Sequence, residues 1–392
     1  MSHRRIALVL GPSTGGIGTH VASVASGLVE RGDAVLVVGP PETEERFGFR
    51  SRGARFAPAP ITAKPSPELP LAVWAARGAL RGVTGRGVDV VHAHGLTAGI
   101  TAMAARPRHA ALVTTWHNQL ITSGFKRRLA DQIEKRLARG VDVALAASSD
   151  LHDHLVALGA ADARLAPVAA PPRLPTGDAD AIRAELGIGD RPLVLSVGRL
   201  HVQKDYDMLI GVASRWGASR PAPVAPPAGV ASDAAPQTGA SSARTFSGAP
   251  VVAIAGDGPE RGRLQGLIDA SGADVRLLGH RTDVGNLLAA ADLAVVTSRW
   301  EARQLFAQEV LQAGVPLVAT RTGGIPELVG DAAVLTETGD ADAFDDAVRS
   351  LLADPARLAS LREAGLAKAA TWPDEAQMLD ALDALYLELT GR

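Results

Sequence analysis

Two glutamates and two glycines near residue 300 form the group of residues with the most chemical potential. Glu301 and Glu309 are separated by seven residues, and Gly323 and Gly324 follow shortly before Pro326. Proline favours the first turn of a helix, so we expect a helix to begin near Pro326. Glycine amide groups at a helix start can bind an anion. We expect Glu301 to lie in a loop and Glu309 one to two turns into the next helix.

Two cations form a second group. Arg199 and Lys204 are five residues apart and follow the apolar run at residues 193–197. An arginine and a lysine placed directly after a strand can converge on a diphosphate. The alternative is a pair of solvated surface cations.

A glycine turn follows another apolar run. The segment Gly256-Asp257-Gly258-Pro259 comes directly after residues 251–255. Glycine, aspartate and proline in this order force the chain to turn at the edge of a sheet. A turn is all that this segment establishes by itself.

Three histidines follow two predicted strands. His92 and His94 end one apolar run, and His117 follows the next. Three imidazoles suggest zinc, but no carboxylate or further ligand lies at helical spacing beside them, so we expect no metal. A histidine at the carboxyl edge of a parallel sheet suits a hydrogen-bonding or acid–base role. His117 is the stronger candidate, because for His92 a purely structural role is equally consistent.

A glycine-rich loop precedes the first predicted helix. The segment Gly15-Gly16-Ile17-Gly18-Thr19-His20 lies between a strand and a helix, so Gly16 would let the backbone approach an anionic ligand. The spacing is not that of the dinucleotide fingerprint, and no acidic residue ends the second strand. A tight turn without a ligand is the alternative.

Alternating strands and helices must position these groups. Helical patterns, notably at residues 18–31 and 125–139, lie between short apolar runs, and this order predicts mostly parallel sheets covered on both faces. The pattern restarts after a proline-rich hinge at residues 166–175, so we expect two doubly wound halves with ligands at the loops that follow strands. The predicted strands are residues 6–10, 34–38, 88–92, 111–115, 143–147, 193–197, 251–255, 275–278, 293–296 and 316–319.

Composition excludes several classes of protein. Hydrophobic residues make up 46% of the 392 residues and charged residues 21%, which excludes a fully disordered chain. The absence of cysteine excludes disulfides, thiolate metal sites and cysteine nucleophiles. Apolar runs are too short for a signal peptide or a membrane-spanning helix, so we expect a soluble, cytoplasmic protein.

Charge is distributed unevenly along the chain. Residues 1–172 carry 20 Lys and Arg against 13 Asp and Glu, whereas residues 173–392 carry 20 against 29. A basic first half suits an anionic partner, and compositional drift is the alternative. Residues 217–249 are rich in Ala, Pro, Ser and Gly without periodicity, which predicts a disordered insertion in a surface loop; a partner-binding tether is the alternative.

Taken together and in order, these motifs resemble those of the retaining GT-B glycosyltransferases of family 4, the glycogen-synthase-like and phosphatidylinositol-mannosyltransferase-like group. The resemblance covers nearly the whole chain. The matching motifs are the Gly-Gly-x-x-x-His loop, the His-x-His strand end, the later histidine, the Gly-Arg-Leu…Lys segment, the Gly-Asp-Gly-Pro turn, and E-x7-E with its Gly-Gly-x-Pro-Glu loop.

The resemblance implies two Rossmann-like domains that face a cleft. Residues 1–172 would be the acceptor-side domain and residues 173–372 the domain that binds a nucleotide-diphosphate sugar. Residues 373–392 would form a C-terminal helix that crosses back to the first domain. The nucleotide sugar is a substrate, so no cofactor is expected. We also expect no nucleic-acid partner, and the acceptor stays unidentified.

The resemblance also assigns roles to individual residues. Arg199 and Lys204 would hold the diphosphate and stabilise the leaving group without a metal. Glu309 would accept hydrogen bonds from the ribose, and Glu301 would lie against the donor sugar. His117 would lie near the reacting anomeric carbon. The further substrate-binding positions would be Gly16, His20, His94, Gly256, Gly258, Gly323 and Gly324.

Two segments depart from the family pattern. Ala302-Arg303-Gln304-Leu305 replaces a Gly-Phe-Gly-like run, which puts a side chain at Gln304 where backbone would approach the sugar. The usual Pro-Asn-Gly turn at the interdomain link is replaced by residues 166–171. A nucleotide-sugar-binding scaffold without activity is therefore the first alternative, and a nucleotide-sugar epimerase is the second.

A basic amphipathic pattern spans residues 125–139. Phe125, Leu129, Ile133 and Leu137 form one stripe, with an excess of basic residues around it. Such a helix can bind an anionic membrane, which would suit a lipid-linked acceptor and a peripheral location at the inner membrane face. The alternative is a core stripe with a solvated basic face.

Overall fold

The computed structural model describes residues 4–13, 15–64, 66–82, 87–118, 124–216 and 246–391, without the side chains of residues 124–127 and 129. The chain forms two compact units. Unit 1 comprises Met1–Ala170 together with Pro373–Arg392, and unit 2 comprises Pro171–Trp372. Most of the predicted insertion at residues 217–249 lies outside the described residues.

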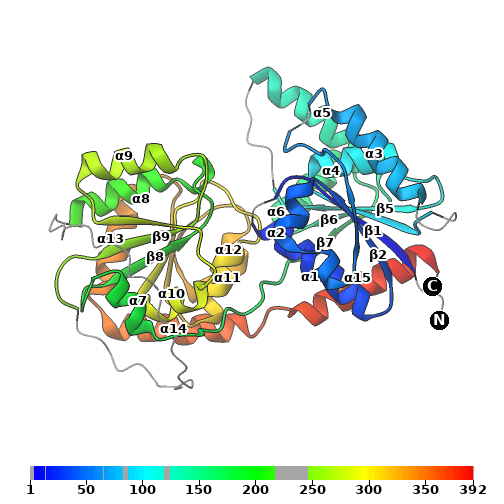
Figure 1. The fold of residues 1–392 in the computed structure, drawn as a ribbon. Helices are drawn as coiled ribbons and strands as arrows, with labels where there is room; N and C mark the ends of the chain where they lie inside the picture. The colour runs from blue at the N-terminus through cyan, green and yellow to red at the C-terminus, as the bar shows by residue number, and fades with distance from the viewer. Residues whose placement is uncertain are drawn as a thin grey trace. The chain divides into compact units, whose positions relative to one another are not determined.

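Unit 1 is built on a seven-stranded parallel sheet in the order β3-β2-β1-β4-β5-β6-β7 (Figure 1). Its central strands are continuous apolar runs, because both faces of a parallel sheet are covered by helices. The strands are β1 (Arg5–Leu10), β2 (Ala34–Gly39), β3 (Arg55–Pro58), β4 (Val90–His94), β5 (Ala111–Trp116), β6 (Val143–Ala146) and β7 (Ala163–Leu165).

Helices cover both faces of this sheet, with α1 and α15 on one face and α3, α4 and α5 on the other (Figure 1). The last helix, α15, belongs to unit 1, because its buried side chains pack into the same apolar cluster as α1 and β1. A capping box of Asp374 and Gln377 begins it. The helices are α1 (Gly16–Glu30), α2 (Pro41–Phe47), η1 (Arg50–Arg52), α3 (Leu69–Gly82), α4 (Leu96–Ala105), α5 (Gly124–Gly140), α6 (Ser149–Leu158) and α15 (Glu375–Thr390).

Unit 2 is built on a six-stranded parallel sheet in the order β10-β9-β8-β11-β12-β13. Adjacent residues of β8 face opposite sides, so that Leu193 and Val194 belong to different apolar clusters. The strands are β8 (Leu193–Val197), β9 (Val251–Ala255), β10 (Val275–Gly279), β11 (Leu293–Val296), β12 (Leu317–Thr320) and β13 (Val334–Thr336).

The helices of unit 2 divide between the two faces of its sheet. One cluster joins the sheet to α7, α10, α11 and α12, and the other joins it to α8, α9 and α13. The helices are α7 (Ala179–Glu185), η2 (Val202–Lys204), α8 (Tyr206–Ala213), η3 (Ser214–Trp216), α9 (Arg261–Ser271), α10 (Val284–Ala290), α11 (Leu305–Gln312), α12 (Ile325–Val329), η4 (Gly330–Ala332), α13 (Ala341–Leu352) and α14 (Pro355–Ala369).

The expectation of two parallel-sheet, Rossmann-like halves is confirmed, with differences at the strand ends. The strand predicted at residues 88–92 runs from Val90 to His94, so that His94 as well as His92 lies within the sheet. Three edge strands, β3, β7 and β13, went unpredicted, because most of their residues are partly or fully exposed and burial therefore does not impose a continuous apolar run.

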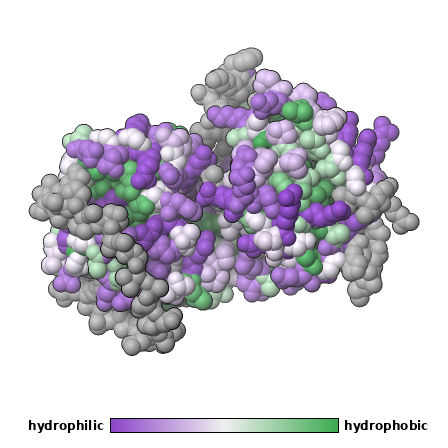
Figure 2. Space-filling view, in the orientation of Figure 1, coloured by the Kyte–Doolittle hydropathy of each residue, from purple (hydrophilic) through white to green (hydrophobic). Residues whose placement is uncertain are grey.

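Hydrophilic residues are spread over the visible face of each unit, with the hydrophobic ones in scattered groups (Figure 2). This distribution agrees with sheets that lie inside their helical layers. Among the residues that the structure describes, no helix combines the length and the apolar character needed to cross a bilayer.

Candidate functional site

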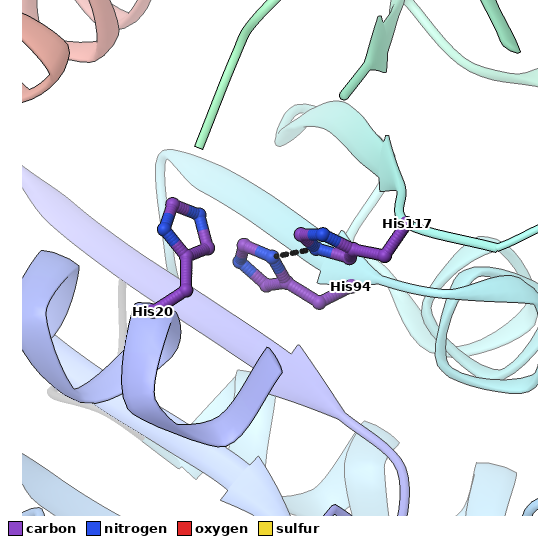
Figure 3. A group of neighbouring side chains, drawn as sticks. All are labelled: His20, His94 and His117. Carbon is purple, nitrogen blue, oxygen red and sulfur yellow. Dashed lines mark hydrogen bonds between the residues drawn. The ribbon is translucent and has the colours of Figure 1, made fainter. Parts of the chain in front are cut away.

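Three histidines gather at the carboxyl edge of the unit 1 sheet (Figure 3). His20 comes from the beginning of α1, His94 is the last residue of β4, and His117 follows β5. β4 lies between β1 and β5, with Leu10 and Thr115 beside His94. The strand order therefore places the loop after β1 and the loop after β5 next to the end of β4, which is where ligands bind in such sheets.

The three rings are close enough to act together. The centroid of the His20 ring lies 5.4 Å from that of His94 and 5.6 Å from that of His117, and the latter two centroids are 5.4 Å apart. His94 Nδ1 and His117 Nε2 share a hydrogen bond of 3.2 Å. The predicted site residues His20, His94 and His117 thus form one cluster.

His92, by contrast, has a structural role. Its side chain is fully buried. Its Nδ1 lies 2.6 Å from the Tyr386 hydroxyl of α15, and its Nε2 lies 2.6 Å from Thr115 Oγ1. Its ring stacks on that of His94, with centroids 4.4 Å apart. Both ring nitrogens are therefore satisfied, and His92 supports His94 from behind.

Burial keeps the cluster uncharged at neutral pH. Desolvation lowers the pKa of His20 to about 4, and the pKa values of His94 and His117 fall well below 6.5 for the same reason. Neighbouring imidazoles lower the pKa values of His94 and His117 further. Neutral rings retain a lone pair, so these side chains can accept a hydrogen bond or bind a cation.

The glycine-rich loop begins α1, with Gly15 as its N-cap and Gly16 as its first residue. Ser13 Oγ accepts a hydrogen bond of 2.9 Å from the Gly18 amide. A Cβ on Gly18 would lie 2.1 Å from the Phe47 ring, so this glycine is required by packing. The loop therefore combines a helix start at Gly16 with a close internal contact at Gly18.

In unit 2 the loops after β8 and β11 meet. Lys204 Nζ forms an ion pair of 2.6 Å with Glu301 Oε1, and both side chains are largely buried. Gln203 Nε2 donates to the Trp300 carbonyl at 2.8 Å. Arg199, on the same loop as Lys204, is exposed and forms no ion pair with any residue that the structure describes. The two predicted cations thus lie in different environments.

Glu309 lies in the second turn of α11, as predicted, while Glu301 lies in the preceding loop. The Glu309 carboxylate accepts a hydrogen bond of 2.9 Å from Arg173 Nε. The Glu309 side chain is 7% exposed, against 41% for that of Arg173. Burial raises the pKa of Glu309, and the Arg173 guanidinium opposes this. Sequence reasoning missed Arg173, since it precedes its partner by 136 residues and stands in no motif.

Gly256 and Gly258 are required by close backbone contacts. Gly256 has a φ of 145°, and a Cβ there would lie 2.0 Å from the Gly198 carbonyl oxygen. A Cβ on Gly258 would lie 2.3 Å from the Leu200 oxygen. The Leu200 amide donates to the Asp257 carbonyl at 3.0 Å. The glycine turn therefore supports the loop that carries Arg199.

The Gly323–Gly324 pair packs on the backbone of Glu301. Gly323 has a φ of 51°, and a Cβ there would lie 1.9 Å from the Glu301 carbonyl oxygen. The Gly324 amide donates to that same oxygen at 2.9 Å. The prediction that Gly324 offers its amide to an anion is therefore wrong, because this amide is already bonded. The helix expected near Pro326 is present as α12, with the proline in its first turn.

The segment that departs from the family pattern lies around the N-terminus of α11. Arg303 lies over the Trp372 ring, 5.6 Å from its centroid. Gln304 is the N-cap residue, and its buried Oε1 has no hydrogen-bond partner among the described residues. Arg303 is thus turned toward an aromatic ring, whereas Gln304 keeps an acceptor atom available.

Comparison with known proteins gives two family matches. The family described as "Glycosyl transferase 4-like domain" matches residues 15–171, and "Glycosyl transferases group 1" matches residues 241–354. The first match covers β2 to β7 and the second covers β9 to β13, whereas β1 and β8 lie before them.

Relatives and solved structures agree with these matches. The chain is 30% identical over 316 residues to D-inositol 3-phosphate glycosyltransferase 1 of Catenulispora acidiphila, covering 76% of this chain and 72% of that one. It is 25% identical over 379 residues to sulfoquinovosyl transferase SQD2 of Arabidopsis thaliana, covering 90% of this chain and 67% of that protein. The structure of Anabaena HepE in complex with UDP-glucose superimposes with a TM-score of 0.76 at 17% identity, covering 98% of this chain and 100% of that one. The chain therefore belongs to the family 4 glycosyltransferases, which have the GT-B fold.

Proposed function

We propose that the protein is a retaining glycosyltransferase that moves a sugar from a nucleotide-diphosphate sugar to a phosphorylated or lipid-linked acceptor. Unit 2 binds the donor, with Lys204 and Arg199 on the diphosphate, Glu309 on the ribose and Glu301 against the sugar. Gly16, His20 and His94 line the substrate side of unit 1, and His117 contacts the reacting sugar or the acceptor.

The ion pair of Lys204 and Glu301 is the observation that carries this proposal. It places an ammonium group and a carboxylate 2.6 Å apart in the loops after two adjacent strands, β8 and β11. An ammonium group attracts a diphosphate, and a carboxylate accepts hydrogen bonds from sugar hydroxyls. Placed together, the two groups suit the junction between the phosphate and the sugar of one donor.

Charge stabilisation supplies the chemistry of this proposal. As the bond between sugar and phosphate breaks, negative charge grows on the departing diphosphate, and Lys204 and Arg199 stabilise it without a metal. The acceptor hydroxyl attacks the same face of the sugar, and the departing phosphate takes its proton. The anomeric configuration is thereby retained without a nucleophile from the protein.

The acceptor proposal has two supports. The first half of the chain is basic, which favours an anionic acceptor. The name of one relative, D-inositol 3-phosphate glycosyltransferase 1, describes a phosphorylated acceptor for that protein. A phosphate group is therefore the feature to vary when acceptors are screened.

We also propose a peripheral membrane contact through residues 125–139. Arg128 and Arg136 of α5 are exposed, whereas Leu137 is fully buried, so that part of the predicted stripe packs in the core. The side chains of Phe125 and Leu129 lie outside the described residues. The basic face alone supports the proposal, through attraction to anionic headgroups. Flotation with anionic vesicles at low salt tests it, and a protein that stays in the dense fraction would end it.

A screen of donors tests the proposed function. Thermal shifts are measured with UDP, GDP and ADP and with their sugars, and donor hydrolysis is then assayed with those that bind. We expect one nucleotide series to stabilise the protein and its sugar to be hydrolysed slowly, with the released sugar first appearing in the donor's anomeric configuration. A protein that none of these nucleotides stabilises would overturn the donor-site assignment.

A second candidate, a nucleotide-sugar-binding scaffold, is favoured by the buried side chain of Gln304 at the start of α11. It replaces a glycine of the family pattern and occupies space where backbone would approach the sugar. Tight binding without hydrolysis or transfer to any acceptor offered would favour this scaffold over the transferase.

A further inference from the structure

The three rings of the histidine cluster have the spacing of ligands around one metal ion. Their centroids form a nearly equilateral triangle with sides of 5.4, 5.4 and 5.6 Å. Three imidazoles bound tetrahedrally at the usual zinc–nitrogen distance would have centroids about 5.2 Å apart. A small inward movement of the rings would complete such a site.

One pair of nitrogen atoms already has the spacing of neighbouring ligand atoms. His94 Nδ1 and His117 Nε2 are 3.2 Å apart, and neighbouring ligand atoms of a tetrahedral zinc ion are about 3.3 Å apart. Counting one ligand atom from each of the three histidines, all lie within 4.8 Å of one another. Three different elements supply them, as Figure 3 shows.

Two nitrogens of the cluster lack partners. His20 Nδ1 and His94 Nε2 are buried, and neither has a hydrogen-bond partner among the residues that the structure describes. Buried polar atoms are normally satisfied, and those that are not often mark the place of an ion or a water. A cation would bind the lone pair of His20 Nδ1, which the protein leaves unused; His94 would bind it through Nδ1, the nitrogen beside His117 Nε2, rather than through its unpartnered Nε2.

The neighbouring histidine shows why the set has three members. His92 stacks on His94, but Tyr386 and Thr115 occupy both of its nitrogens. It therefore cannot bind a metal without losing a buried hydrogen bond. It forms the wall that fixes the His94 ring, which is a common role for groups outside a metal's own ligands.

The donor set limits the metal. Three imidazoles without a carboxylate or thiolate suit zinc, cobalt, nickel or copper, whereas calcium and magnesium require oxygen ligands. We propose that His20, His94 and His117 form a transition-metal site that binds Zn²⁺, with the fourth coordination position left to water. Its three ligands are the histidines that the proposed function places on the substrate side of unit 1, so the ion and the substrate would compete, although the charge stabilisation proposed for unit 2 needs no metal. A bound ion would occupy the lone pair of His117 and so block its contact with the sugar.

Metal binding by the full chain tests the proposal. Metal-free protein is dialysed against Zn²⁺ and bound metal is counted, and Co²⁺ is then added as a coloured probe. We expect one Zn²⁺ per chain and the intense visible absorption of tetrahedral Co²⁺. Less than one bound ion per chain at micromolar free Zn²⁺, or only the weak spectrum of octahedral Co²⁺, would overturn the site.

Substitutions assign the ligands. His20→Asn and His117→Asn should each weaken Zn²⁺ binding by more than about 100-fold, since loss of a group outside the ligand shell already costs 10- to 100-fold. His280→Asn is the matched control, because this histidine is exposed and lies in unit 2, and it should bind as the original chain does. Circular dichroism of the metal-free variants verifies their folding. Unchanged binding in His20→Asn would refute the proposed ligand set.

Discussion

The histidine cluster of unit 1 and the charged loops of unit 2 handle burial in opposite ways. In unit 1, burial lowers the pKa values of His20 and His94, and the cluster stays uncharged. In unit 2, Glu301 forms an ion pair with Lys204, and Glu309 forms one with Arg173. The first region has lone pairs to offer, and the second has charges that already have partners.

This difference determines how each region can bind a ligand. A paired charge is held in position, and a diphosphate can join the pair without desolvating an isolated ion. An uncharged imidazole binds through a directional hydrogen bond or a metal bond rather than through charge. We therefore expect changes in unit 2 to affect nucleotide binding and changes in unit 1 to affect turnover.

The largest effect should come from the backbone that supports Glu301. Gly323→Ala would place a Cβ against the Glu301 carbonyl at a positive φ and should destabilise unit 2 by about 3 kcal/mol. Urea unfolding measures the change. Gly262→Ala is the control, because no atom lies within 4 Å of its added Cβ, and it should be neutral or slightly stabilising. Equal changes in the free energy of unfolding for the two variants would show that the Glu301 carbonyl does not exclude a side chain at Gly323.

The charge pair provides the next largest effect. Lys204→Ala should weaken binding of the preferred nucleoside diphosphate more than tenfold, about 1.4 kcal/mol or more, because a charge-assisted contact is lost. Isothermal titration calorimetry measures it, with Lys64→Ala in unit 1 as an exposed control. Unchanged affinity in Lys204→Ala would remove this residue from the donor site.

A buried hydrogen bond in unit 1 should matter less. Tyr386→Phe leaves His92 Nδ1 without its partner and should lower the free energy of unfolding by about 1 kcal/mol. Leu387→Ala changes the adjacent residue of α15, which is 52% exposed, and should stay within about 0.5 kcal/mol of the original chain. If the two variants are equally stable, the support of His92 by α15 is not significant.

Arg173 offers the most subtle test. Its guanidinium lowers the pKa of Glu309, which burial raises. In Arg173→Ala burial acts unopposed, so the pKa of Glu309 should rise and the carboxylate should become protonated at a higher pH. Because the charged form is the better acceptor for ribose hydroxyls, nucleotide affinity should begin to fall at a higher pH than in the original chain. Titrations over a pH series measure this.

The matched control for that series is Arg321→Ala. Arg321 pairs with Glu337, and both side chains are exposed. An exposed pair contributes little, so the pH dependence of binding should not move. A shift of equal size in both variants would show that general charge, rather than the contact with Glu309, controls the titration.

The sequence was sufficient to predict both sheets, because long buried parallel strands are continuous apolar runs such as residues 6–10 and 251–255. It could not reveal β3, β7 and β13, whose few residues lie at sheet edges. It also ended this strand at His92, since polar residues begin there, although the pairing of β4 with β1 and β5 continues to His94. A histidine whose ring nitrogens have buried hydrogen-bond partners can continue a strand, even though a polar residue in the sequence is normally taken as the end of a buried strand.

The candidate site was predictable where residues follow strands and unpredictable where contacts span the chain. His94, His117, Glu301 and Glu309 all follow apolar runs or a helix start. The contacts of Arg173 with Glu309 and of Tyr386 with His92 span 136 and 294 residues and belong to no motif. Likewise, the role of His20 in a cluster depends on strand order, which spacing along the chain does not reveal.

One paired measurement tests the central claim most directly. Nucleoside diphosphate affinity and donor turnover are compared in Lys204→Ala and His117→Ala. The account predicts that Lys204→Ala loses affinity more than tenfold, whereas His117→Ala binds the nucleotide within about twofold of the original chain yet loses most of its turnover. If His117→Ala instead loses nucleotide affinity as severely as Lys204→Ala, the division of roles between the two regions is contradicted.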